Sequence, residues 1–205
     1  KAYKNGTEYL FKEPSVTYGV SINTASSDPL ASVTYTDDAV GMTAGAVAWD
    51  SKDIFKDIKP CLLKNGVRVG YLNKSNYAQW EAGQGLSGTP DITSGSAGDV
   101  MVEFPKVGWK FTTSGNNLLV QITNDPGRGS EGFRYLAHTR VTEGDRDYLY
   151  VGAYIGTVVS NALRSLSGKT CTVSQTIGAF RTYAQANGSG YDQQHFYAIT
   201  LMQIL

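Results

Sequence analysis

Short segments of alternating apolar and polar residues, separated by tight-turn signals, fill the first half of this chain and limit it to a strand-rich fold. Segments 16–22 and 33–36 carry an apolar residue at every second position, which is the period of a half-buried strand. The strongest turn signal is Asn65-Gly66, which stands between two apolar runs. Both residues tolerate a positive φ, so the pair predicts a type I′ hairpin.

Three longer strands are predicted in the middle of the chain. They cover 99–104, 107–113 and 118–123. Pro105 interrupts the first pair, because proline cannot donate to a strand ladder, and the polar segment 114–117 forms the turn between the second pair.

Three other segments have weaker signals. Segment 75–83 predicts one short helical turn with Ser75 as its cap. Segment 147–158 predicts a further strand, and the polar segment 160–171 predicts an exposed loop.

The hydrophobic period changes from two to about 3.6 residues near the C-terminus, and this predicts two helices. Thr176 is a suitable N-cap for the first helix, and Gly188 supplies its stop. The second helix is predicted to begin near Asp192. Its expected buried stripe consists of Phe196, Ile199, Thr200 and Ile204.

The last helix is apolar on almost every side, because Leu201 and Met202 widen its stripe. Such a helix is expected to be covered on several sides. Further chain after Leu205, a neighbouring subunit, or the preceding sheet alone would each provide that cover, and the sequence leaves the three alternatives open.

A Gly-, Ser-, Thr- and Pro-rich segment at 83–99 suggests a boundary between two portions of the chain, 1–88 and 89–205. The segment contains a formal GxGxxG at 83–88. A dinucleotide site needs a strand before this motif and a helix after it, and neither is predicted here. No cofactor is therefore expected.

Charge and hydropathy exclude two classes of partner. The 18 basic and 18 acidic residues cancel, so no basic surface is expected to bind nucleic acid. No apolar run reaches transmembrane length, so no membrane insertion is expected. The 13 tyrosines and 23 glycines suit strands, turns and exposed aromatic contacts.

Catalytic and metal-binding signals are weak. The two histidines, His138 and His195, are far apart in the chain, and no GxSxG motif offers a nucleophile. Asp37-Asp38 has no second acidic cluster to complete a carboxylate pair. Cys61 and Cys171 lack metal-ligand spacing, and two buried thiols or one long-range disulfide both remain open. We predict a protein that is not an enzyme, with no catalytic residues and no metal site.

Aromatic residues on polar segments are the best candidates for ligand binding. Aromatic faces with amide neighbours suit both sugar rings and protein interfaces. The loop around Tyr191 is the most plausible recognition segment, and Tyr77 and Trp80 lie on another polar stretch. The candidate ligand-binding residues are Tyr191, Asp192, His195, Trp80 and Tyr77.

Several blocks of the sequence resemble a group of phage and prophage structural proteins of gut Firmicutes, described as tail, fibre or receptor-binding proteins. The most specific blocks are DVMVEFPK at 99–106 and TIGAFRTYAQANG at 176–188. The resemblance runs from about residue 14 to the end of the chain. Members of the group continue past the counterpart of 199–205, so further chain after Leu205 is expected.

The resemblance implies an α+β fold. Residues 1–88 would form a β-rich N-terminal assembly portion. Residues 89–205 would form a C-type-lectin-like domain, a twisted antiparallel sheet with two helices, and the resemblance implies that this domain continues past Leu205. The calcium motifs of such lectins are absent from the sequence, so calcium-dependent sugar binding is not expected.

The function implied by the resemblance is a phage virion structural protein. It would be a tail, fibre or baseplate component that binds a host-surface glycan or protein without catalysis. Its partners would be other virion proteins and further copies of itself, with a homotrimer favoured, and it would be located in the virion. The alternative is a head fibre or capsid decoration protein with a purely structural role.

Overall fold

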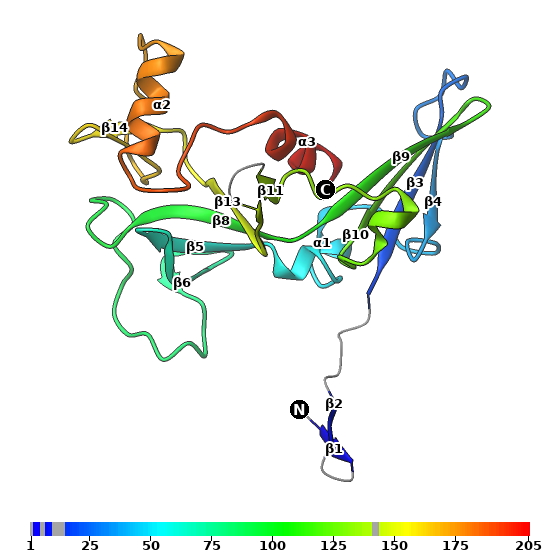
Figure 1. The fold of residues 1–205 in the computed structure, drawn as a ribbon, viewed down its shortest axis with the longest axis horizontal. Coiled ribbons are helices and arrows are strands. Elements are labelled where there is room, and N and C mark those ends of the chain that lie inside the picture. Colours follow the sequence, from blue (N-terminus) through cyan, green and yellow to red (C-terminus); the bar gives the residue numbers. More distant parts are fainter. Residues whose placement is uncertain (1, 5–6, 10–14, 141–143) are drawn as a thin grey trace.

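The computed structural model describes residues 2–4, 7–9, 15–140 and 144–205. Two antiparallel sheets dominate it, and a few short helices complete a β-rich α+β fold (Figure 1). The α+β class predicted from the sequence is confirmed at this level.

The four-stranded sheet has the order β4-β3-β10-β9. Tyr18 pairs with Ile122, and Ile122 pairs with Trp109. These three side chains are buried, whereas Phe111, nearer the other end of the sheet, is exposed. One end of the sheet therefore belongs to the core and the other projects from it (Figure 1). The strands are β3 (Thr17–Asn23), β4 (Val33–Asp37), β9 (Gly108–Ser114) and β10 (Asn117–Thr123).

The five-stranded sheet has the order β13-β8-β5-β6-β7, and every pairing in it is antiparallel. Its centre is apolar, because Leu62 of one strand pairs with Val100 of the next and both are fully buried. The strands are β5 (Lys59–Lys64), β6 (Val67–Asn73), β7 (Asn76–Trp80), β8 (Asp99–Pro105) and β13 (Tyr148–Gly152).

Three two-stranded ribbons accompany the sheets. Each is antiparallel, and the last one packs beside α2 (Ile177–Gln185). The ribbons are β1 (Ala2–Lys4) with β2 (Thr7–Tyr9), β11 (Thr139–Arg140) with β12 (Gly144–Asp145), and β14 (Thr157–Val159) with β15 (Ala162–Arg164).

The turn signals of the sequence are confirmed. Asn65 and Gly66 have φ values of 52° and 76° and join β5 to β6, as a type I′ hairpin requires. The three strands predicted from residue 99 onward are also present, with ends within two residues of those expected.

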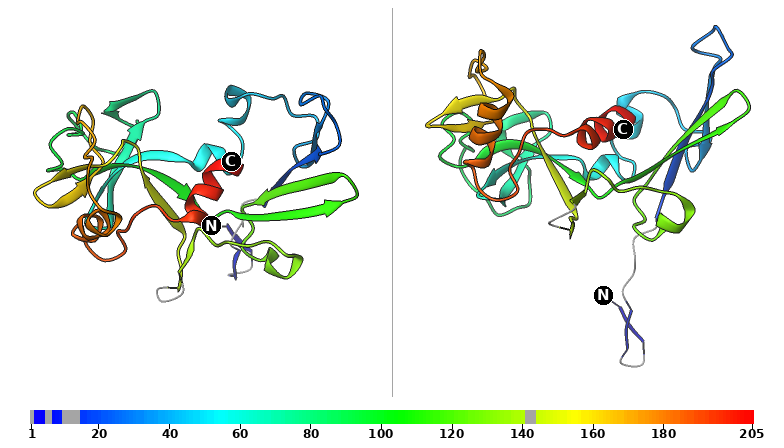
Figure 2. Two further views of the ribbon diagram at one scale, coloured as in Figure 1. Left: turned by 90° about the horizontal axis from the view of Figure 1, so that it is seen from above. Right: turned by 45° about the horizontal axis from the view of Figure 1, so that its top comes forward.

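The main core lies where the two sheets meet. The chain passes from β8 of one sheet to β9 of the other through Val107, which is fully buried. Phe104 before it and Trp109 after it belong to one apolar cluster, together with Leu201 of α3 (Phe196–Ile204). Figure 2 shows α3 between the two sheets in both views. The last helix is therefore part of the core that joins them.

The two C-terminal helices are present, and the first is capped as predicted. The Thr176 side chain accepts a hydrogen bond from the Ala179 backbone N–H at 3.1 Å. The second helix begins later than predicted, because His195 and not Asp192 takes the N-cap position. The shorter helices are α1 (Ala46–Trp49), η1 (Phe55–Asp57) and η2 (Arg128–Glu131).

The buried face predicted for the last helix is right for Thr200 and Ile204, which are half-buried, and wrong for the other two residues. Ala198 and Leu201 are buried, whereas Phe196 and Ile199 are 73% and 39% exposed. A helix that is apolar on nearly every side has no distinct hydrophobic face, so its periodicity does not choose which side is covered. The position of the two sheets makes that choice.

Two other local predictions are corrected. Segment 75–83 contains strand β7 and not a helical turn, because pairing with β6 outweighs a weak helical signal. Segment 160–171 is not an exposed loop, since it contains β15 and the buried Leu166. In both cases tertiary pairing gives a polar segment a regular structure.

The expected boundary between 1–88 and 89–205 does not separate the sheets. Strand β3 pairs with β10, and β5 pairs with β8, so each large sheet contains strands from both portions. Cys61 and Cys171 are both free thiols, and the long-range disulfide that the sequence left open is not formed.

Candidate functional site

A groove of about 920 Å³ runs over one face of the five-stranded sheet. Its base is formed by β8 and β13, and its walls come from the β14–β15 ribbon, α2, the 187–195 loop and the start of α3. The sheet fixes the base by strand pairing, while the walls come from segments late in the chain. Residues far apart in the sequence therefore face one another across it.

Tyrosine side chains dominate the apolar lining of the groove. Tyr148 is 45% exposed, and Tyr150, Tyr154 and Tyr191 are half-buried. The Tyr191 hydroxyl accepts a hydrogen bond from the Gly66 backbone N–H at 3.1 Å, and burial raises the pKa of this phenol. The contact ties the 187–195 loop to the β5–β6 turn, so the wall is held to the base.

The structure brings together three of the five residues that the sequence nominated. Tyr191, Asp192 and His195 all line the groove. Tyr77 and Trp80 do not line it, since they pack on β7 against the small apolar cluster of Leu62, Leu72 and Val100. Sequence proximity to polar residues nominated both segments, and it did not distinguish the groove-lining loop from a strand whose aromatic side chains pack against a core cluster.

Asp192 and His195 also have structural contacts. An oxygen of Asp192 lies 3.6 Å from Nε of Arg181 on α2. Nδ1 of His195 accepts the Ala198 backbone N–H at 3.3 Å and so caps α3. Burial and the nearby charge of Arg140 lower the pKa of His195. This imidazole is therefore neutral at pH 7 and can act as the cap acceptor.

Behind the groove tyrosines lies a buried carboxylate that sequence reasoning missed. Glu103 on β8 is 1% exposed. It accepts hydrogen bonds from Nη1 of Arg68 at 2.6 Å, from the Tyr71 hydroxyl at 2.6 Å and from the Tyr150 hydroxyl at 2.7 Å. A lone acid within the apolar strand 99–105 was the signal that could have revealed it.

The Glu103 network holds the groove base in place. Burial and hydrogen bonding to the carboxylate raise the pKa of both Tyr71 and Tyr150, so both hydroxyls stay protonated and donate. The Arg68 guanidinium lies 4.3 Å from the Tyr71 ring centroid and 5.9 Å from that of Tyr148. Burial raises the pKa of the neighbouring Cys61 thiol to about 12, which keeps it unreactive.

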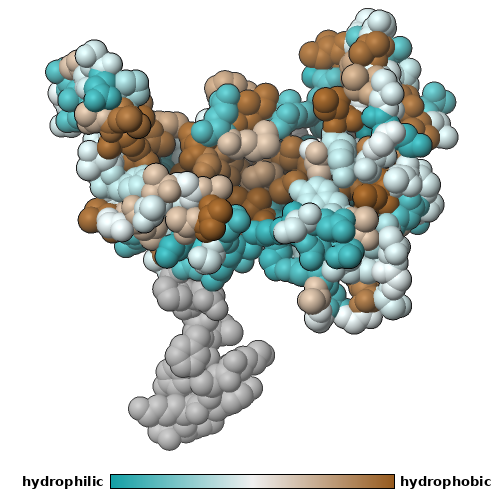
Figure 3. All heavy atoms as spheres, turned by 180° about the vertical axis from the view of Figure 1, so that it is seen from behind, coloured by the Kyte–Doolittle hydropathy of each residue, from teal (hydrophilic) through white to brown (hydrophobic). Residues whose placement is uncertain are grey.

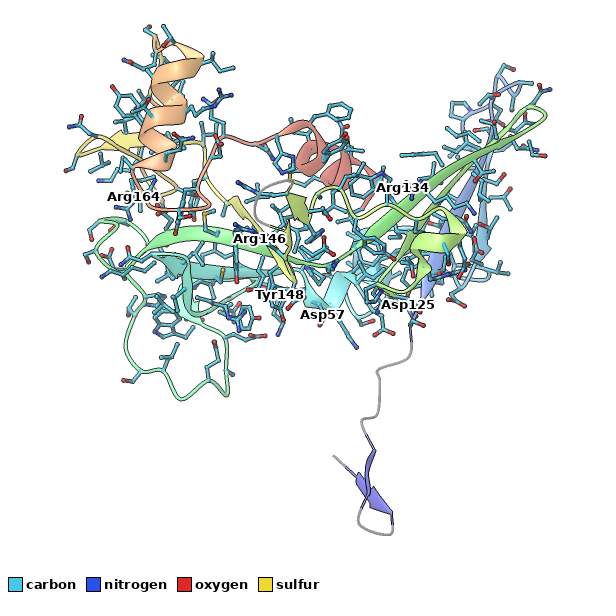
Figure 4. The ribbon with its side chains drawn as sticks, viewed as in Figure 1. Asp57, Asp125, Arg134, Arg146, Tyr148 and Arg164 are labelled. Atoms are coloured by element: carbon cyan, nitrogen blue, oxygen red, sulfur yellow. The ribbon has the colours of Figure 1, made fainter. Side chains whose placement is uncertain are left out.

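A second ion pair, between Arg164 and Asp99, fixes the end of the groove next to the β14–β15 ribbon. Nε of Arg164 donates to Oδ1 of Asp99 at 2.8 Å, and the Ser165 backbone N–H donates to the same oxygen at 2.9 Å. Figure 4 shows Arg164 at this end and Arg146 with Tyr148 nearer the middle of the molecule. The Arg164–Asp99 pair connects β15 to β8, so the ribbon is anchored to the sheet.

His138 is a buried imidazole at the groove wall. It is 1% exposed, and neither ring nitrogen has a hydrogen-bond partner among the residues that the structure describes. Burial lowers its pKa to about 4, and the nearby charge of Lys106 acts in the same direction.

The free energy of unfolding is expected to fall as the pH drops from 6.5 to 4, with His138 as one cause. The unfolded chain protonates this imidazole near pH 6.5, whereas the folded protein keeps it neutral down to about pH 4. The unfolded state therefore binds more protons in this window, and His138 contributes a loss of about 2 kcal/mol between pH 7 and pH 5.

Urea unfolding at pH 7 and pH 5 measures this loss. The variant His138→Gln lacks the titrating group and should lose about 2 kcal/mol less than the parent protein over the same interval. Equal losses in the two proteins would show that His138 is protonated freely in the folded state.

A smaller cavity of about 420 Å³ lies at the other end of α3. Tyr18, Tyr35, Trp49 and Phe55 surround it, and the Trp49 ring lies edge-on to the other three, at 5.1–5.6 Å between centroids. Leu205 also lines this cavity. Figure 3 shows apolar side chains gathered in the hollow between the two lobes of the molecule.

The large groove combines three kinds of side chain. It offers phenol rings, amide side chains such as Gln193 and Gln194, and fixed guanidinium groups. In the described part of the chain, no three His, Cys, Asp or Glu side chains gather in a way that could hold a metal ion. Among the helices described, none is long and apolar enough to cross a membrane.

Comparisons with known proteins leave the groove as the main guide to function. No protein-family model, no curated protein and no solved structure matches this chain.

Proposed function

We propose that this protein is a structural component of a phage virion that binds a glycan on the host surface without chemically altering it. The observation that carries the proposal is the groove of about 920 Å³ whose base and walls present four tyrosines. A tail, fibre or baseplate position agrees with the resemblance of the sequence to phage structural proteins.

The groove has the features that sugar recognition needs. A pyranose ring presents an apolar face of C–H groups and a rim of hydroxyls, so it suits aromatic side chains beside amides. Tyr148 offers an exposed ring, and Gln193 and Asn187 offer amide groups in the same groove. The Glu103 network restrains the neighbouring Tyr150, so little side-chain freedom is lost when a ligand binds there.

Assembly would multiply a weak single contact. One shallow groove gives modest affinity, and several copies displayed on one particle raise the effective concentration for the second and third contacts. We propose a homo-oligomer, with a trimer favoured as in fibres, attached to other virion proteins. The virion is the proposed location.

The C-type-lectin-like description of residues 89–205 is part of the same proposal. A twisted antiparallel sheet with two accompanying helices supports it, since β8 and β13 lie beneath α2 and the start of α3. The sheet also includes β5, β6 and β7 from before residue 89, so the proposed lectin-like arrangement would take strands from both portions.

Replacing Tyr148 with alanine is expected to weaken glycan binding about tenfold. The change removes an exposed ring from the groove, and central aromatic contacts usually account for 1–2 kcal/mol or more of binding, by order of magnitude. The measurement is binding of the fluorescently labelled chain to an oligosaccharide array and to intact cells of gut Firmicutes.

Tyr197→Ala is the matched control. Tyr197 is 42% exposed, close to the 45% of Tyr148, but it lies on α3 and does not line the groove. The control should bind as the parent protein does. A parent protein that binds neither the array nor any cell would contradict the proposed function, and equal losses in both variants would remove the groove from it.

A head fibre or capsid decoration protein is the second candidate. The exposed apolar side chains of α3, Phe196 and Ile199, favour it, because such residues suit contacts between subunits. Tight attachment of the purified chain to capsids, with no binding to any host envelope, would support this candidate over host recognition.

A further inference from the structure

We propose that the smaller cavity, of about 420 Å³, binds an alkylated ammonium group such as the trimethylammonium group of choline. This would be a second ligand site, since no residue that lines it also lines the large groove. Its volume lies within the range of about 300–1,000 Å³ that small-molecule sites occupy.

Aromatic side chains from four separate elements line the cavity. The plane of the Trp49 ring stands at 62–82° to the planes of the other three rings, so the cluster is not a stack and its ring faces are turned in several directions. A cation is attracted to the face of an aromatic ring, and several rings around one space form the cages that hold quaternary ammonium groups. The four residues are Tyr18 of β3, Tyr35 of β4, Trp49 of α1 and Phe55 of η1.

Two of these rings are held in place by their own segment. Nε1 of Trp49 donates to the Thr43 carbonyl at 3.1 Å, which uses the only donor of the indole and leaves its face for a ligand. Ile54, directly before Phe55, is 1% exposed and has a φ of 72°, which a β-branched residue rarely adopts. Such strain persists where the surrounding structure enforces it, and it is frequent at ligand sites.

The charge at the cavity favours a cation. Asp50 is the one charged residue among the described residues that line it. Asp50 is exposed, and no ion pair in the described part of the chain includes it. Lys52 and Lys56 follow it on the same segment but do not line the cavity. The Asp50 carboxylate can therefore pair with a bound cation.

Two further carboxylates act on the same wall. Burial raises the pKa of the Tyr18 phenol, and the charges of Asp53 and Asp38 raise it further, against a smaller opposite effect of Lys56. These side chains together give the wall around Tyr18 a negative potential, which agrees with the charge of Asp50.

The rest of the lining selects an alkylated cation over a metal ion or a bare ammonium. Val20 and Val120 pair across the sheet and both line the cavity, as do Ile204 and Leu205. A metal ion needs several oxygen ligands, and a bare ammonium needs several acceptors for its N–H groups. A trimethylammonium group has no N–H to satisfy, so apolar walls, aromatic faces and one carboxylate suit it.

The test is a titration of the nitrogen-15-labelled chain with choline chloride at constant ionic strength, followed through the indole N–H signal of Trp49 by NMR. The matched ligand is the neutral analogue of choline in which carbon replaces the quaternary nitrogen, because it has the same shape without the charge. Choline should bind about tenfold more tightly than this alcohol, since the aromatic faces and the carboxylate attract only the charged ligand.

Asp50→Asn should reduce the affinity for choline about threefold and leave the affinity for the neutral alcohol unchanged. Asp28→Asn is the charge-matched control, because Asp28 is also exposed and does not line the cavity. This control should bind choline as the parent protein does.

Every outcome on the parent protein decides the inference. Equal affinities for choline and the alcohol would overturn the cation site, and tighter binding of the alcohol would overturn it in favour of an apolar docking surface. A Trp49 signal that moves with neither ligand would overturn it as well. The comparison of the two ligands remains decisive even if Asp50→Asn proves unstable, and none of these results bears on glycan binding in the large groove.

Discussion

Replacing Glu103 with alanine is expected to lower the free energy of unfolding by about 3–5 kcal/mol, the largest effect of any single change considered for this protein. The carboxylate is 1% exposed and accepts three short hydrogen bonds, from Arg68, Tyr71 and Tyr150. Its removal leaves two phenol donors and one guanidinium without their acceptor. The two half-buried phenol donors account for most of the loss, since the Arg68 side chain is 34% exposed and its guanidinium can turn to water.

The measurement is urea unfolding followed by tryptophan fluorescence at pH 7. Glu131→Ala is the matched control, because Glu131 also pairs with an arginine, Arg128, at 2.6 Å but is largely exposed. The unfolding midpoint of this control should stay close to that of the parent protein, because water solvates the partners of an exposed pair. A midpoint for Glu103→Ala as high as that of the control would show that the buried network does not stabilise the fold.

The same variant should also weaken ligand binding if the groove is the recognition site. Tyr150 donates to Glu103 and lines the groove, so loss of the carboxylate releases part of the base. The phenylalanine variants Tyr71→Phe and Tyr150→Phe each remove one donor while keeping the ring. They should cost about 1–2 kcal/mol each, which separates the hydroxyl contribution from that of the Arg68 charge.

Replacing Leu201 with alanine is expected to cost about 3 kcal/mol of stability. Leu201 is 0% exposed and packs in the cluster that contains Phe104 of one sheet and Trp109 of the other. Truncation removes buried methyl groups and leaves a cavity at the junction, and such changes usually cost about 2–5 kcal/mol. Urea unfolding is again the measurement.

Ile199→Ala on the same helix is the control. Ile199 is 39% exposed, so its truncation should cost less than about 1 kcal/mol. The pair of variants tests which face of α3 is covered. A larger loss for Ile199 than for Leu201 would support the stripe that periodicity predicts and contradict the structure.

The contrast between these two residues shows where sequence reasoning stops. Helix existence follows from local signals, such as Thr176 as a cap, and these were sufficient for α2. Which side of a helix becomes buried follows from the difference in hydrophobicity between its faces, and the faces of α3 are almost equally hydrophobic. The sequence predicted that α3 must be covered, but the side that it predicted was only partly right, because the covered side depends on where two sheets from distant segments meet.

The candidate site shows the same division. The loop with Tyr191, Asp192 and His195 was predicted because aromatic and amide residues stand together in a glycine-rich segment. Tyr148 and Arg140 could not be predicted as members of the same groove. They are more than 40 positions before Tyr191 in the sequence, and only the fold brings them to the same groove as the 187–195 loop. Trp80 shows the opposite error, since pairing in a strand moved a promising aromatic residue away from the groove.

The sequence by itself determined most of the longer strands, the tight turns and the β-rich class, but not β7 or β15, because alternation and positive-φ dipeptides act over a few neighbouring residues. Only the tertiary structure decided that each sheet combines strands from both halves of the chain and that Glu103 is surrounded by donors from two other strands. The physical reason is the distance along the chain over which each kind of interaction acts. Backbone conformation is set locally, whereas burial and charge pairing depend on segments that meet only when the chain has folded.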